Sequence, residues 1–338
     1  MKKIGYFRQG GEVNIGNAFI DIGALVSISE AIKDKEDYLE PAQVSLFPVF
    51  SEALANVKRI SPLLRPFWRK FGKFIGRDLL DRGYKLIKVS DKFNLPIVLE
   101  MDYFVIAGNA LTVLFSRVAH KLLCKLKERG VKIIFYGCGG TTYSDFEINI
   151  VKRMLKEIKP YALITRDSIA FQEYGNLAEY SFDGIDAAFF VNKLQFKLFK
   201  LNLPPYVVLV FDKPQSRRIE KALEKELKER YLIIKACHTP IPYFFSDPVA
   251  DKSKFVSNSP YDYLSLYAHA EEVHGDRVHA CIVALAFGKR CRLYGKTVRV
   301  ALFEKICTGD LTSETVLPKG NIDKLQEKQI SFLSHILE

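Results

Sequence analysis

The sequence lacks several patterns that define whole classes of protein. Its six cysteines are scattered, mostly within apolar runs, and none forms a Cys-x-x-Cys pair. Neither a structural zinc site nor a disulfide framework is therefore predicted, and free thiols in a reducing compartment fit best. A His-Glu-x-x-His motif and an Asp-x-Asp-type carboxylate cluster are also missing, so no metal and no cofactor are expected. No tandem repeat or low-complexity tract occurs.

Acidic residues are in short supply, and apolar targeting segments are missing. Against 50 lysines and arginines stand 39 aspartates and glutamates, which gives a net charge of +11 and favours anionic partners. The N-terminus, Met-Lys-Lys-Ile-Gly-Tyr-Phe-Arg, has no apolar signal core, and we expect no apolar run long enough to cross a bilayer. These features predict a cytoplasmic protein. A length of 338 residues with 48% hydrophobic and 26% charged residues predicts a globular protein of two domains.

Strand and helix patterns alternate along most of the chain, which is typical of an α/β fold built from βαβ units. The first series contains strands expected at 3–7, 44–50, 94–99, 102–112, 131–136 and 162–165, and helices at 116–129 and 145–158. A second series begins after Leu201-Asn-Leu-Pro-Pro205, with strands at 206–212 and 232–238 and helices at 216–231 and 261–269. The sequence therefore predicts a first lobe over 1–200, a second over 205–318, and a terminal helix over 321–338 that crosses back onto the first lobe.

The stretch from Glu272 to Tyr294 combines a polar cluster with an apolar segment that ends at Gly288. It predicts a loop, then a buried helix, a glycine stop and a short strand. Arg277 and His279 would diverge by about 200° on a helix, whereas an extended or turn backbone could direct both at one ligand. An anion-binding acid/base site at the helix N-terminus is one interpretation. A capped core helix with incidental charges is the other.

Asp276-Arg277-Val278-His279, followed by Ala-Cys-Ile-Val-Ala-Leu-Ala-Phe-Gly-Lys, resembles the signature of the polysaccharide pyruvyl transferase family. In that family an Arg-x-His pair precedes a helix of small apolar residues, and Gly-Lys and a strand follow. The resemblance implies a glycosyltransferase-B-like architecture of two Rossmann-like lobes with a ligand cleft between them. It also implies transfer of the enolpyruvyl group of phosphoenolpyruvate onto sugar hydroxyls as a pyruvate ketal.

Other segments resemble the family less specifically. Asn14-Ile-Gly-Asn17 stands where Asn-x-Gly-Asp is common, so Asn17 replaces an acidic residue. Gly108 and Asn109 end an expected strand, and Arg166 ends another in an Arg-Asp pair. Gly184-Ile-Asp-Ala-Ala-Phe-Phe190 resembles the Asp-x-Ala-Phe motif, and we interpret Asp186 as structural rather than catalytic. A tight strand-to-helix turn at 14–17 and an ion pair of Arg166 at a helix start are the alternatives. His238, at a further strand end, lines the cleft in one interpretation and is a satisfied or exposed histidine in the other.

The resemblance implies a role for each of these residues. Arg166 and Arg277 would hold the carboxylate and phosphate of the donor, because guanidinium groups bind both in bidentate fashion. His279 would be the general acid, the N–H of Val278 would add a donor, and Asp276 would orient Arg277. We expect Asn14, Gly16, Asn17, Gly108, Asn109 and His238 to bind substrate as well.

The acceptor remains open in the sequence. Residues 58–88 are rich in basic and aromatic side chains, which suit a solvated basic face, an anionic membrane surface or, less well, a nucleic-acid groove. Membrane contact at the inner face would fit a lipid-linked glycan acceptor, and a free oligosaccharide is equally open. We expect no nucleic-acid partner, and the oligomeric state is unknown. A nucleotide-sugar glycosyltransferase, with Glu271 or Glu272 binding a ribose, and a non-catalytic sugar- or phosphate-binding relative are the alternative functions.

Overall fold

The structure is a computed structural model of the whole chain. It describes the following ranges: 1–8, 14–38, 41–44, 100–195, 198–238, 254–295 and 297–338. Apart from Val44, these residues belong to one compact unit formed by Met1–Gln43 and Glu100–Glu338. The strand expected at 94–99, most of that at 44–50, and the basic segment 58–88 lie outside the described residues.

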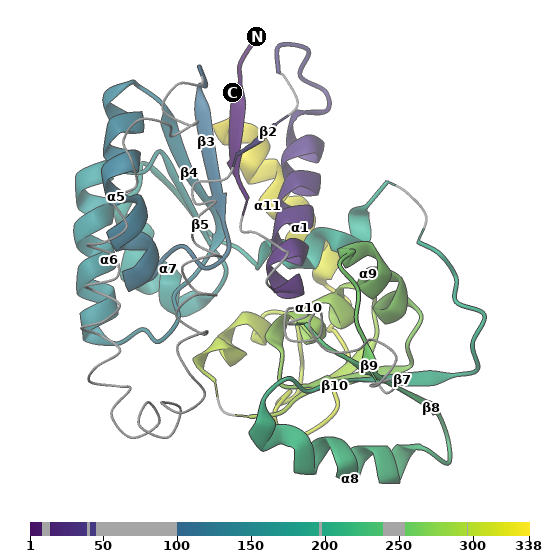
Figure 1. Cartoon of the computed structure of the whole chain (residues 1–338). Coiled ribbons are helices and arrows are strands. Elements are labelled where there is room, and N and C mark those ends of the chain that lie inside the picture. The colour runs from purple at the N-terminus through teal and green to yellow at the C-terminus, as the bar shows by residue number, and fades with distance from the viewer. Residues whose placement is uncertain (9–13, 39–40, 45–99, 196–197, 239–253, 296) are drawn as a thin grey trace. The chain divides into compact units, whose positions relative to one another are not determined.

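Two sheets organise the described chain (Figure 1). The first has the order β2-β1-β3-β4-β5-β6 and the second the order β11-β10-β7-β8-β9, and every strand pair with a defined register is parallel. The strands of the first sheet are β1 (Ile4–Phe7), β2 (Ala42–Val44), β3 (Tyr103–Ala107), β4 (Lys132–Cys138), β5 (Ala162–Thr165) and β6 (Tyr180–Asp183). Those of the second are β7 (Tyr206–Val210), β8 (Leu232–Ala236), β9 (Lys254–Phe255), β10 (Glu272–Gly275) and β11 (Arg290–Leu293).

Helices flank both sheets, which explains why strands such as β3 and β7 are buried at every position. Around the first sheet, α5, α6 and α7 lie along one side and α1 and α11 along the other (Figure 1). The α-helices are α1 (Ile15–Ile32), α5 (Val113–Glu128), α6 (Asp145–Ile158), α7 (Ser168–Tyr174), α8 (Arg217–Leu227), α9 (Pro260–Ala268), α10 (Val278–Ala286) and α11 (Ile322–Ile336). Short 3-10 helices are η2 (Gly175–Leu177), η3 (Ala187–Lys193), η4 (Pro214–Ser216) and η6 (Val298–Phe303).

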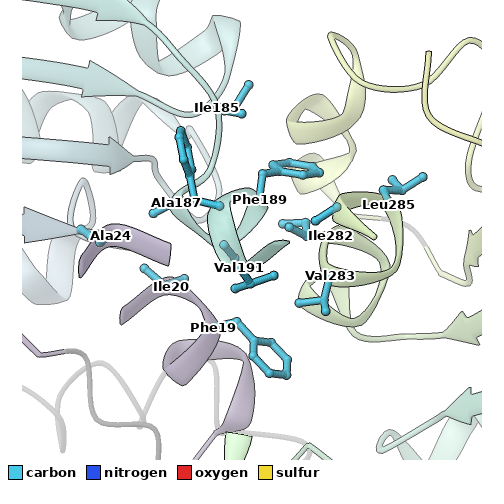
Figure 2. Packing of buried hydrophobic residues seen from close by; sticks show 14 of the residues in the cluster. Phe19, Ile20, Ala24, Ile185, Ala187, Phe189, Val191, Ile282, Val283 and Leu285 are labelled. Atoms are coloured by element: carbon cyan, nitrogen blue, oxygen red, sulfur yellow. The ribbon is translucent and has the colours of Figure 1, made fainter. Parts of the chain in front are cut away.

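One hydrophobic core joins elements of both series. Figure 2 shows Phe19 and Ile20 of α1, Phe189 and Val191 of η3, and Ile282 of α10 converging within it. Helix α10 is buried nearly all round, so its apolar residues contact neighbours on every side. Because α10 is held in a rigid core, the polar residues at its start are fixed in place. This agrees with the buried helix that the apolar segment of the sequence predicts.

Helix α1 is long and apolar enough to cross a membrane by length and composition, which corrects our expectation that no run reaches that length. Most of this helix is buried within the protein, where it packs against η3, α10 and α11. A core helix passes the same test of length and composition. We therefore read α1 as part of the packing that holds the two sheets.

The last helix closes over the segment that follows β6. The Gln329 side chain accepts a hydrogen bond from Ile185 N at 2.7 Å and donates one to Ile185 O at 3.3 Å. Gln326 Nε2 donates to Phe189 O and to Asn192 Oδ1, each at 2.7 Å. Each buried backbone group left without such a partner would cost about 1–3 kcal/mol, so these amides fix residues 185–192 against α11.

Several secondary-structure predictions hold closely, and the prediction for Glu272–Gly275 is wrong. Helix 145–158 and strand 162–165 begin and end as predicted. Helix α6 starts at a Ser144 cap with Asp145 and Glu147 in its first turn, where acidic side chains are stabilised. Glu272–Gly275, predicted as loop, is instead strand β10, which is hydrogen-bonded between β7 and β11. Pairing on both sides stabilises this short strand although its sequence carries no apolar alternation.

Candidate active site

Arg166 lies at the carboxyl end of β5 and is 2% exposed. Its Nη1 is 3.0 Å from Asp186 Oδ2, and its Nη2 donates to Asn109 Oδ1 at 3.2 Å and to Gly140 O at 3.3 Å. The Nε atom is buried and has no hydrogen-bond partner among the described residues. The structure thus joins Arg166 and Asn109, from two different strand ends, and leaves one guanidinium donor free.

The loop after β4 leaves space for the side chain of Arg166. A Cβ atom at Gly139 would lie 2.4 Å from Arg166 Nε, so this position tolerates no side chain. Tyr143, in the left-handed region at φ 51°, accepts a hydrogen bond from Gly140 N at 2.8 Å and donates one to Asp167 Oδ2 at 2.7 Å. Because Asp167 also caps α7, the loop and the start of that helix are held together.

Asp186 links Arg166 to His279. Its Oδ2 is 3.0 Å from Arg166 Nη1 and 3.9 Å from His279 Nε2, and its Oδ1 accepts from Ala188 N at the start of η3. Burial alone would raise the pKa of Asp186, but His279 and the Arg166 guanidinium outweigh burial and lower that pKa to about 2. Asp186 is therefore an ionised carboxylate that both caps η3 and lies between the two candidate site residues.

His279 is the second residue of α10, and its side chain is 11% exposed. Its Nδ1 lies 2.8 Å from the place where a Cβ atom at Gly16 would be, so the start of α1 is directly against the imidazole ring. Asn14 caps α1 by accepting from Gly16 N at 3.0 Å, and Asn17 N donates to Asn14 O at 2.9 Å. The His279 Nε2 atom makes no hydrogen bond within the described part of the chain. The ring thus lies between the start of α1, next to Nδ1, and Asp186, which is 3.9 Å from Nε2.

Arg277 points to a different carboxylate from His279. It is the extended N-cap residue of α10, and its Nε donates to Asp212 Oδ2 at 2.7 Å. Asp276 accepts from the backbone N–H groups of Asp212 and Lys213 at 3.2 and 3.1 Å. Asp276 Oδ1 is also 3.9 Å from Arg277 Nε, so it acts on the arginine mainly by holding the Asp212 loop. No side chain caps the start of α10 among the described residues, which leaves the Val278 end of the helix suited to an anion.

His238 is a buried, packed histidine. It is 1% exposed, its Nε2 is 2.5 Å from Tyr267 Oη, and its ring lies against those of Phe19 and Tyr263. Its backbone N–H donates to Asp212 Oδ2 at 3.1 Å, and its carbonyl accepts from Ile15 N at 3.0 Å. The satisfied-histidine interpretation fits these contacts, and a role of His238 in substrate binding stays a prediction.

The burial of His238 should make stability depend on pH. Burial, together with the nearby Arg277 and His279, lowers the pKa of His238 from 6.5 to about 3, although Asp212 opposes the shift. Between these values the unfolded chain binds a proton that the folded chain does not. The free energy of unfolding should therefore fall as pH drops from 6.5 toward 4, by up to about 1.4 kcal/mol per pH unit from this residue. Urea titrations at pH 7, 6 and 5 measure how the free energy of unfolding changes with pH. The same pH dependence in His238→Gln as in the unaltered protein would contradict the assignment.

Arg299, near the start of η6, is an arginine beside the candidate site that the sequence analysis did not single out. Burial and the charge of Arg166 lower the pKa of Arg299, whereas Asp186 and Tyr143 act in the opposite direction. The guanidinium is half-buried within electrostatic reach of Arg166. No pattern around Arg299 marks it, because it stands in a short helix after the last strand. Asp212 was missed as well, although an acidic residue directly after strand β7 is a usable signal.

The predicted residues form two neighbouring groups. Asn109, Arg166, Asp186 and His279 are connected through hydrogen bonds or close charges, and Asn14 and Gly16 lie against His279. Arg277 belongs with Asp212 and the backbone of His238. Gly108, at φ 75°, turns the chain before Asn109. Arg166 pairs with Asp186 and Arg277 with Asp212, and Arg166 Nε remains a cationic donor without a partner among the described residues, which suits an anionic ligand.

Two parallel sheets with cationic side chains at strand and helix ends define a glycosyltransferase-B-like protein of two Rossmann-like lobes, as predicted. The polysaccharide pyruvyl transferase family profile matches residues 45–295, which is more than half of the chain. The chain belongs to this family, and it is a transferase. The resemblance around residues 276–289 is thereby confirmed.

Comparison with solved structures supports the fold alone. The chain is similar to the Staphylococcus aureus MnaA–UDP structure (TM-score 0.54, 12% identity, covering 99% of this chain and 91% of that one). It is also similar to UDP-N-acetylglucosamine 2-epimerase from Rickettsia bellii (TM-score 0.52, 15% identity, covering 100% of this chain and 96% of that one). A comparison with curated protein sequences found no match.

Proposed function

We propose that this transferase moves the enolpyruvyl group of phosphoenolpyruvate onto hydroxyls of a glycan sugar and forms a pyruvate ketal. The observation that carries the proposal is the meeting of Arg166 and His279 at Asp186, with Arg166 Nε and His279 Nε2 both buried and without hydrogen-bond partners among the described residues. Buried polar atoms without partners are candidates for contact with a ligand, and these two belong to residues that face the same carboxylate. Guanidinium groups fit a donor with a carboxylate and a phosphate.

The reaction assigns a balanced role to each group. His279 protonates C3 of the enol, which becomes a methyl group, while a sugar hydroxyl forms a bond to C2. A second hydroxyl then bonds to C2 as the C2–O bond to phosphate breaks, and the two hydroxyl protons end on C3 and on phosphate. Arg166, Arg277 and the N-terminus of α10 stabilise the negative charge of the carboxylate and the leaving phosphate. Asn109 and Asp186 position Arg166.

A nucleotide-sugar enzyme is the second candidate, because the similar structures include a UDP complex and UDP-sugar epimerases. The carboxylates considered for ribose binding argue against it. Glu272 is the first residue of β10, and its side chain contacts His274 Nε2 at 3.0 Å and Arg290 Nη1 at 3.3 Å. Glu271 directly precedes that strand. Both therefore lie at the amino end of the parallel strands, whereas ligands of open α/β sheets bind at the carboxyl end.

The test compares ligands by thermal stabilisation and calorimetry. Phosphoenolpyruvate should raise the midpoint of unfolding, because a ligand of the native state stabilises it by mass action. Pyruvate, inorganic phosphate and UDP-N-acetylglucosamine serve as controls. Turnover is then followed as phosphate release with a panel of free and lipid-linked glycans, with mass spectrometry of the product. Stabilisation by the UDP-sugar alone would favour the second candidate, and a response to neither would favour a non-catalytic relative.

The acceptor and the location stay predictions. A lipid-linked glycan would bring the protein to the inner face of the membrane, and a free oligosaccharide would leave it in the cytoplasm. The basic segment 58–88, which would make such a membrane contact, lies outside the described residues. Phosphate release with the two acceptor types distinguishes them.

Gly16→Ala should separate turnover from stability. The added Cβ atom would lie 2.8 Å from His279 Nδ1, so the ring must shift. A misplacement of about 1 Å in a catalytic group can lower turnover about 100-fold. Alanine also favours the α-helix over glycine by about 1 kcal/mol, which offsets part of the contact strain, so the unfolding midpoint should change little. In the control Gly175→Ala the three nearest atoms all belong to the Phe171 ring, and turnover should remain. Normal turnover in Gly16→Ala would show that the ring position is not critical.

A further inference from the structure

The outer helices of the first sheet carry a group of potential metal ligands separate from the candidate active site. His120 and Cys124 lie on α5 and Glu157 on α6, and one ligand atom from each lies within 4.8 Å of the others. His120 and Cys124 are four residues apart, so they share one face of α5. Helices α5 and α6 pack against each other, and Lys127 Nζ donates to Glu157 O at 2.9 Å. The group is therefore built across a fixed helix–helix contact.

The histidine nitrogen lies beside the carboxylate of the group. His120 Nε2 is buried and forms no hydrogen bond among the described residues, although Glu157 Oε2 is 2.9 Å away. At that distance a missing hydrogen bond means that the ring nitrogen is not directed at the oxygen. Two side-chain atoms that both point at one metal ion, rather than at each other, show this geometry. All six cysteines lie in the described part of the chain, and five of them are buried, so Cys124 is the accessible thiol.

We propose that His120, Cys124 and Glu157 bind one zinc ion that links α5 to α6. Imidazole, thiolate and carboxylate together suit zinc, whereas calcium and magnesium prefer oxygen ligands. Tetrahedral zinc would hold its ligand atoms about 3.3–3.6 Å apart. The atoms of this group lie within 4.8 Å of one another, so they need to move by about 1 Å. Glu157 is half-exposed and free to move that far. A fourth position remains for water.

The site would support the candidate active site from a distance. Helix α5 begins at the Thr112 cap, shortly after Gly108 and Asn109, and α6 begins at the Ser144 cap after the Gly139 loop. A zinc ion between the two helices would hold the loops at their N-terminal ends in a fixed relation.

The test uses the full chain without an affinity tag, first freed of metal. Cobalt(II) should bind once per chain and produce the near-ultraviolet charge-transfer band of a thiolate ligand, and zinc should remove the band and raise the unfolding midpoint. Cys124→Ser should abolish the band, and His120→Asn or Glu157→Gln should weaken binding roughly 100-fold or more, beyond the loss typical of second-shell changes. His335→Asn, in an exposed His335–Glu338 pair that contains no thiol, is the matched control and should leave binding unchanged.

Absence of the band in the unaltered chain, or its persistence in Cys124→Ser, would overturn the proposal. The same holds if zinc binds equally to Glu157→Gln. This variant changes a half-exposed residue and should stay folded, so it keeps the test decisive if Cys124→Ser does not fold. Circular dichroism of each variant verifies the fold.

Discussion

Replacing His279 with glutamine should lower turnover by about 10²–10⁴-fold and leave the affinity for phosphoenolpyruvate within a few-fold. A positioned general acid contributes a factor of this size, and glutamine cannot transfer the proton. The affinity should persist because the arginines and the start of α10 bind the anionic groups. Phosphate release gives the turnover, and calorimetry gives the donor affinity.

His269→Gln is the matched control for this variant. His269 ends α9, and its Nδ1 is 2.8 Å from Ser265 O. Among the described residues it makes no contact with Arg166, Asp186 or His279, so turnover and donor affinity should both be unchanged. If His279→Gln retained turnover, the acid would be another group. If it lost donor affinity instead, the histidine would be a binding residue.

The elements of this site could be predicted from the sequence, but their connections could not. Arg166 stands at the end of a strand whose bounds were predicted correctly, because a run of apolar residues between two helices is a strong local signal. Its contact with Asn109 depends on the spatial order β3-β4-β5, which local patterns do not determine. Asp186 was interpreted as structural, and it does cap η3, but the same carboxylate also pairs with Arg166.

The errors have physical causes. Strand β10 was missed because Glu272–Gly275 is short and polar, and pairing on both sides rather than propensity stabilises it. We expected that an extended backbone could direct Arg277 and His279 at one ligand. Arg277 is extended, yet it pairs with Asp212, whereas His279 faces Asp186. Their separate partners, Asp212 and Asp186, come from segments far away in the sequence. Arg299 could not be found, since only the folded chain brings it near Arg166.

Replacing Arg166 with methionine should have the second large effect, on both stability and donor binding. Asp186 would keep a buried charge without its closest charged partner, and breaking such a pair costs about 3–5 kcal/mol. Donor affinity should also fall about 10–100-fold, since hydrogen bonds to charged groups contribute about 1.5–3 kcal/mol. Urea unfolding and calorimetry with phosphoenolpyruvate measure the two losses.

The double variant Arg166→Met/Asp186→Leu separates the two roles. Replacing a whole buried ion pair by apolar side chains is often neutral or stabilising, so the double variant should regain most of the lost stability. Donor affinity should stay low, because the guanidinium is absent. The control Lys152→Met removes one partner of the half-exposed Lys152–Glu173 pair and should cost less than about 1 kcal/mol without changing affinity. A double variant that binds the donor normally would reduce Arg166 to a structural residue. One that remains unstable would mean that the fold depends on the contacts of Arg166 with Asn109 and Gly140 or on the η3 cap that Asp186 provides.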